Sequence, residues 1–179
     1  MRHRSRIRRV TRPSVALAAA LVLAACAGRP APARPAAVPA DFSGTWETDL
    51  ARSTGVPASV VGSRIVDVVR QTRDSLTIES VSTDAQGRVE QPTRRAYALD
   101  GSPTTWRYPE RGVEMVDVVR WEGATLIIHH TSRDRAGRES VFVDHVSLSP
   151  DGRTMTSERV FAPGTPQERR ISVVAGRTR

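Results

Sequence analysis

The sequence contains no lysine and only one cysteine, so its basic side chains other than histidine are all arginines and no internal disulfide can form. Arginines number 27 against 19 acidic residues, and the net charge is +8. Six of the arginines lie within residues 1–25, a stretch with no acidic residue. Because the remainder of the chain is nearly balanced in charge, we expect no nucleic-acid partner.

The chain also lacks the common sequence motifs of catalysis. It contains no Gly-x-Ser-x-Gly elbow, no phosphate-binding loop, no His-Glu-x-x-His and no paired cysteines. Strand alternation places His129 on the opposite face from His130, and the predicted register separates His130 from His145 by about 13 Å. Three histidines in this arrangement cannot share one metal ion. We therefore predict that the protein is not an enzyme and has neither a metal site nor a cofactor.

Residues 1–25 have the pattern of a secretion signal. A basic segment ends at Arg12, and the apolar run from Val15 to Ala25 is too short to span a bilayer as a helix. Leu23-Ala24-Ala25 followed by Cys26 resembles the bacterial lipobox. This resemblance implies that residues 1–25 form a lipoprotein signal peptide and that the Cys26 thiol carries a lipid. An ordinary secretory peptide with an incidental cysteine is the alternative.

A lipid on Cys26 implies attachment to a membrane of the cell envelope. The next residue is Ala27, whereas an aspartate there resembles an inner-membrane retention signal in Gram-negative lipoproteins. We therefore expect an outer-membrane anchor with the protein facing the periplasm, if the organism is Gram-negative. Residues 26–40 are rich in proline and alanine and favour an extended tether. The folded domain is predicted over residues 41–179.

The domain has the alternating pattern of β-strands throughout. Valine, isoleucine and threonine recur with a period near two, and pairs such as Asp100-Gly101 and Asp151-Gly152 separate the runs. Residues 49–63 are the ambiguous stretch, predicted as a loop with a short helical turn. The pattern predicts an all-β antiparallel meander of about 8–10 strands that closes into a barrel. The candidate strands are 42–48, 64–72, 75–83, 88–99, 104–109, 113–121, 124–132, 138–149, 153–161 and 168–175.

An internal repeat of 50 residues runs through the domain. Val66-Asp67-Val68-Val69-Arg70 recurs as Val116-Asp117-Val118-Val119-Arg120, and residues 66–90 share 11 identities with the segment 50 positions later. We interpret the repeat as two similar strand–hairpin–strand units. Neither unit can bury its apolar face alone, so both must close against other strands.

A short motif at the start of the domain resembles a known family. Phe42-Ser43-Gly44-Thr45-Trp46, followed by Asp49-Leu50 and Ser53, is similar to the opening of bacterial lipocalin-like domains, and residues 148–156 resemble a late hairpin of that group. The resemblance implies a lipocalin-like β-barrel over residues 41–179. It also implies that Trp46 closes one end of the barrel beneath a basic residue near the last strand, for which Arg169 and Arg170 are the candidates.

Predicted strand pairing identifies an inward face. A two-residue loop at 123–124 places Asp117 opposite His130 and Val119 opposite Ile128, and the next predicted register places His130 opposite Val141. An aspartate beside a histidine can tune a general base, but Asp67 recurs opposite Ser80, which favours a structural pair. The residues predicted to line a ligand cavity are Trp46, Val69, Ile78, Val119, Trp121, Leu126, Ile128, Val141 and Val143.

Two functions remain open at this point. The first is an envelope lipoprotein whose barrel binds a small apolar or amphipathic ligand. The second is a non-enzymatic structural or assembly accessory protein of the envelope, in which the same side chains fill a solid core and the partner is another envelope protein. The low aromatic content of 4% does not by itself demand a tight apolar pocket.

Overall fold

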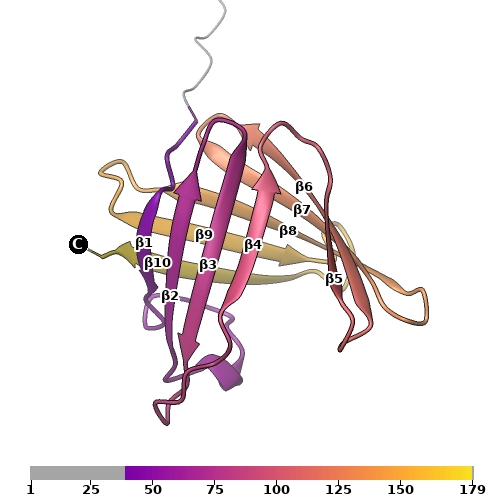
Figure 1. Cartoon of the computed structure of the whole chain (residues 1–179), viewed down its shortest axis with the longest axis horizontal. Coiled ribbons are helices and arrows are strands. Elements are labelled where there is room, and N and C mark those ends of the chain that lie inside the picture. Colours follow the sequence, from indigo (N-terminus) through magenta and orange to yellow (C-terminus); the bar gives the residue numbers. More distant parts are fainter. Residues whose placement is uncertain (1–38, 179) are drawn as a thin grey trace, which may run out of the picture. The chain divides into compact units, whose positions relative to one another are not determined.

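The computed structural model of the protein describes residues 39–178. They form one antiparallel sheet of ten strands and a short 3-10 helix, η1, at Ala58–Val60 (Figure 1). The predicted all-β meander is confirmed, as is the helical turn within 49–63. No helix in this part of the chain has the length and apolar character needed to cross a membrane. The strands are β1 Gly44–Thr48, β2 Arg64–Gln71, β3 Ser75–Thr83, β4 Thr93–Ala98, β5 Thr104–Tyr108, β6 Val113–Glu122, β7 Thr125–Arg133, β8 Glu139–Leu148, β9 Thr154–Phe161 and β10 Arg169–Arg177.

The sheet curls into a nearly closed barrel. Strands follow one another in chain order, and β1 pairs with both β2 and the last strand, β10, so the order is β4-β3-β2-β1-β10-β9-β8-β7-β6-β5. In Figure 1, β2, β3 and β4 lie in front of β8, β9 and β10 and cross them. The outer edges of β4 and β5 are not paired by a ladder, although the Ala98 amide donates to Thr104 Oγ1 at 3.4 Å where the two strands connect.

The sequence repeat corresponds to two structurally equivalent hairpins, β2–β3 and β6–β7, and the turns that follow them are built alike. The Asp84 amide donates to the Arg88 carbonyl at 2.9 Å, and the Asp134 amide donates to the Arg138 carbonyl at 3.0 Å. In each turn the arginine side chain returns to the aspartate carboxylate at 2.7 Å. The repeat is therefore an architectural unit, and its two copies lie in different parts of the barrel wall.

An apolar cluster fills one end of the barrel, near the β2–β3 and β6–β7 turns. Trp46 is fully buried there, and its indole Nε1 donates to the Phe42 carbonyl at 2.9 Å. The guanidinium of Arg177 lies 4.6 Å from the Trp46 ring centroid. Gly44 has φ +142°, a backbone conformation that other residues rarely adopt, which accounts for the glycine of the Gly-x-Trp motif beside Arg177.

The basic residue that covers Trp46 is thus Arg177, and the expectation that Arg169 or Arg170 does so is wrong. Arg169 lies over the Phe161 ring, with 4.1 Å to the centroid. Arg170 forms ion pairs with Glu158 and Glu168. Both arginines stand at the start of β10, whereas β1 pairs with the end of that strand, where Arg177 lies opposite Trp46.

The predicted register of β7 with β8 is wrong by one residue. His130 pairs with Phe142 and not with Val141, because Gly137 at φ +77° closes a longer turn over 134–138. A slip of one residue exchanges the two faces of a strand. Val141 and Val143 therefore leave the predicted inward face: Val141 is 41% exposed, and Val143 pairs with Val160 on the outer face. The predicted pairing of Asp117 with His130 is confirmed.

Substitutions at equivalent positions of the two hairpins test this arrangement. Val69 and Val119 are buried in the apolar cluster, whereas Val118 faces outward beside His129. We expect Val69→Asp and Val119→Asp each to lower the free energy of unfolding by about 3–5 kcal/mol, because each buries a carboxylate without a partner. Val118→Asp should cost clearly less. Urea denaturation of the three variants measures the difference, and a larger loss in Val118→Asp would show that the two faces are reversed.

Candidate ligand-binding cavity

The interior of the barrel beyond the apolar cluster is hollow. A cavity of about 550 Å³ lies between the two walls of the sheet, within the range typical of small-molecule sites. Leu50, Val56 and Val60, from the segment that joins β1 to β2, contribute to its lining. Apolar side chains of the strands supply about half of the rest, among them Ile65, Ile78, Val146, Met155 and Ile171. The polar side chains that line it include Asp67, Arg95, Tyr97, Asp144, Ser157 and Arg159.

The predicted ligand-binding residues occupy three different environments. Ile78 and Ile128 line the cavity. Val141 and Val143 lie on the outer face of β8. The others belong to the apolar cluster or pack against it, and Trp121 stacks on Phe42 with 6.0 Å between ring centroids; these residues are Trp46, Val69, Val119, Trp121 and Leu126. Cys26, the predicted lipidation site, lies outside the described residues.

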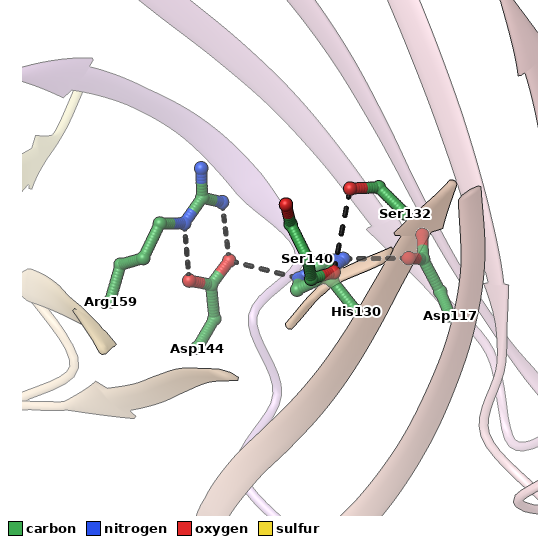
Figure 2. Close-up of polar contacts among 6 residues, drawn as sticks. All are labelled: Asp117, His130, Ser132, Ser140, Asp144 and Arg159. Carbon is green, nitrogen blue, oxygen red and sulfur yellow. Dashed lines mark hydrogen bonds and ion pairs between the residues drawn. The ribbon is translucent and has the colours of Figure 1, made fainter. Parts of the chain in front are cut away.

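A chain of buried ion pairs runs along one wall of the barrel, from β9 through β8 and β7 to β6 (Figure 2). Arg159 donates Nε and Nη2 to the two carboxylate oxygens of Asp144, each at 2.6 Å. His130 Nε2 lies 3.2 Å from Asp144 Oδ2, and His130 Nδ1 lies 2.6 Å from Asp117 Oδ1. Asp117 and His130 are 0% exposed. We call these four residues the polar chain.

The partners within the polar chain determine which of its groups are charged. Burial alone would lower the pKa of His130, but the hydrogen bonds with Asp117 and Asp144 outweigh it and raise the pKa. Burial alone would raise the pKa of Asp144, but Arg159 and then His130 lower it to about 2. When His130 is protonated, its imidazolium between two carboxylates, with a guanidinium at one end, makes the polar chain electrically neutral.

This arrangement does not provide a general base. Both ring nitrogens of His130 are bound to carboxylates, so neither is free to take a proton from a substrate. The first repeat has Ser80 in place of the histidine, and Ser80 Oγ donates to Asp67 Oδ1 at 2.5 Å. An inward polar pair therefore occurs in both hairpins. Within residues 39–178 no group of three or more histidine, cysteine or acidic side chains is arranged so that it could hold a metal ion.

Sequence reasoning missed the polar residues of the cavity wall. Arg95 and Tyr97 alternate with Ala96 and Ala98 on β4, and both line the cavity. The alternation of small and large residues was the available signal, because side chains along a strand point to opposite faces. Asp144 and Arg159 were missed because the register of β8 was predicted one residue away.

No protein-family model matches the chain, and no curated protein matches it. Among solved structures, apo lipid binding protein 8 of Caenorhabditis elegans matches with a TM-score of 0.54 and 13% sequence identity, covering 76% of this chain and 95% of that one. The fatty-acid-binding protein isolated from Manduca sexta matches with a TM-score of 0.48 and 10% identity, covering 76% and 99% of the two chains.

The chain shares the β-barrel fold of the Caenorhabditis elegans protein. The β-barrel expected from the sequence is confirmed, with ten strands against the predicted 8–10 and the eight of an ordinary lipocalin. At 13% identity the likeness concerns the fold, and the residues of the cavity have to be interpreted from this chain alone.

The polar chain predicts how stability depends on pH. His130 holds its proton more tightly in the folded protein, so its contribution is complete below its ordinary pKa of 6.5 and is lost as pH rises through the raised value. Asp144 contributes fully to stability above pH 3.8, its ordinary pKa, and this contribution is lost as the pH falls through about 2. The polar chain therefore stabilises the barrel most between about pH 4 and pH 6.5.

Urea denaturation between pH 5 and pH 9 tests this expectation. The free energy of unfolding should fall as pH rises above 6.5, the ordinary pKa of histidine, and His130→Gln should remove most of that decline. His129→Gln is the matched control, because His129 lies on the other face of β7 and its pKa is lowered by burial. A decline that persists unchanged in His130→Gln would mean that the histidine is not charged in the folded protein.

Proposed function

We propose that the barrel binds a small apolar or amphipathic molecule in its cavity. The observation that carries this proposal is a space of about 550 Å³ enclosed by both walls of the sheet and lined mainly by apolar side chains. A solid core would leave no such space, since protein interiors pack at the density of organic crystals. Burial of a ligand against these side chains supplies binding free energy in proportion to the apolar area removed from water.

The fold supports the same use of the interior. The Caenorhabditis elegans protein with this fold is a lipid binding protein. In the present chain the segment between β1 and β2 brings Leu50, Val56 and Val60 to the cavity, so the ligand would be covered by a loop as well as by strands. Loops are the parts of a fold that open most readily, which gives a ligand a route in.

Filling the cavity tests the proposal. Ile78→Trp adds bulk on the cavity wall, whereas Val81→Trp places the same large side chain on the outer face of β3, where Val81 is 38% exposed. Organic extracts of the purified proteins are compared by mass spectrometry. We expect one reproducible small molecule in the wild type and Val81→Trp and at least a ten-fold smaller amount in Ile78→Trp. Equal amounts in all three proteins would place the molecule outside the cavity.

We further propose that the protein works at a membrane of the cell envelope, held by a lipid on Cys26 and facing the periplasm from the outer membrane in a Gram-negative cell. The support is the lipobox-like Leu23-Ala24-Ala25-Cys26 behind a basic and then apolar segment. A proline-rich tether over 26–40 would hold the barrel away from the lipid surface.

Metabolic labelling with a fatty acid tests the anchor. In a bacterial host the wild-type chain should incorporate the label and partition into the detergent phase. Cys26→Ser removes the thiol that accepts the lipid, so label and partitioning should both be lost, while Ser43→Ala in the barrel should change neither. A wild-type chain without label would contradict the lipoprotein proposal and leave the ligand-binding proposal standing.

A further inference from the structure

One cation on the cavity wall has no counter-ion in the described part of the chain. Arg95 lines the cavity from β4, and no carboxylate of residues 39–178 lies within 4.0 Å of its guanidinium. Its neighbour Arg94 faces outward and pairs with Glu79 at 3.6 Å. Arg159, which also lines the cavity, is held by both oxygens of Asp144. Arg95 is therefore a partly buried charge with no ion-pair partner among these residues, and the attraction of Asp117 reaches it only from beyond 4.0 Å.

An arginine cannot relieve such burial by losing its proton. Burial alone would lower the pKa of Arg95, but Tyr97, two residues along the same strand, outweighs it and the pKa is raised. The charge is thus retained inside the barrel. An unpaired buried charge is costly, and an anion brought into the cavity would remove that cost.

Asp67 is the competing candidate for recognising a charged ligand, since it also lines the cavity and pairs with no cation within 4.0 Å in the described residues. Its situation differs from that of Arg95. Burial raises the pKa of Asp67, and the hydrogen bond from Ser80 opposes this only in part. A carboxyl group can become neutral by taking up a proton, so Asp67 does not require a cationic ligand.

We infer that Arg95, with Tyr97 beside it, binds the acidic group of an amphipathic anion whose apolar part lies against Ile78, Val146 and Ile171. The planar guanidinium can donate two parallel hydrogen bonds to a carboxylate, which fixes the orientation of the ligand as well as its charge. This inference rests on the proposed function, because it specifies the chemical class of the ligand that the cavity takes.

A series of twelve-carbon probes tests the inference. Dodecanoate, 1-dodecanol and dodecylammonium share the apolar chain and differ in the charge of the head group. Each displaces Nile red from the whole chain, which is kept soluble with an amphipathic polymer so that no detergent monomer competes for the cavity. We expect dodecanoate to bind most tightly, and Arg95→Met to weaken it about 10- to 100-fold while changing dodecanol less than about two-fold.

Two further variants make the result specific. Arg94→Met removes an arginine from the neighbouring outward position and should leave all three affinities unchanged. Arg95→Lys keeps the charge without the paired donors and should retain most of the preference for dodecanoate over dodecanol. Unaltered dodecanol binding by Arg95→Met shows that this variant is folded, and if that variant does not fold, Arg95→Gln replaces it.

The possible outcomes separate this inference from the proposed function. Equal binding of dodecanoate and dodecanol, unchanged in Arg95→Met or Arg95→Gln, would overturn the inference and leave the cavity as an apolar site. A preference for dodecylammonium that disappears in Asp67→Asn would also overturn it and would assign the cavity to cations. Failure of every probe to displace Nile red would overturn both the inference and the proposed function.

Discussion

The polar chain of Arg159, Asp144, His130 and Asp117 links four neighbouring strands through ion pairs. Asp144, His130 and Asp117 are buried, whereas the Arg159 side chain is 35% exposed. Each charge has a partner at hydrogen-bonding distance, which is the condition under which burying charges is tolerated. The carboxylate oxygen Asp117 Oδ2 is buried and has no hydrogen-bond partner among residues 39–178. Removing one member would leave its neighbour as an uncompensated charge.

Apolar and polar side chains are unevenly distributed inside the barrel. Apolar packing is concentrated at the end closed by Trp46, Phe42 and Trp121. Beyond that end, positions that face inward carry aspartate, histidine and arginine on one wall and Asp67, Arg95 and Tyr97 on the other. The cavity lies between the two walls, and apolar side chains such as Ile78 and Val146 make up much of its lining.

The two copies of the repeat place the same inward aspartate in two different polar contacts. Both copies place an aspartate inward on the first strand of a hairpin, at Asp67 and Asp117. In the first copy the partner is Ser80, which leaves a carboxyl group that lines the cavity. In the second copy the partner is His130, which extends the contact across β8 to β9. The difference of one side chain turns a local pair into a connection across four strands.

Sequence patterning was sufficient for the strands and the first hairpin registers, because alternation and turn glycines are local properties. It placed Asp117 opposite His130 and Val119 opposite Ile128. It failed at β8, because the register there depends on the number of residues in the 134–138 turn. The pattern of apolar residues does not reveal that number. The cavity could not be predicted either, since a space depends on how two distant walls curve toward each other. Cys26 and the tether stay predictions of the sequence.

The central claim is that the barrel encloses an open cavity lined largely by apolar side chains. Crystals of the protein, stripped of bound lipid and pressurised with xenon, test it most directly, because xenon enters empty apolar spaces and is seen by its anomalous scattering. We expect xenon peaks inside the barrel beside Ile78 and Val146, with the polar chain intact. An interior without xenon, in which side chains of the two walls are in contact, would contradict the claim and favour a solid barrel.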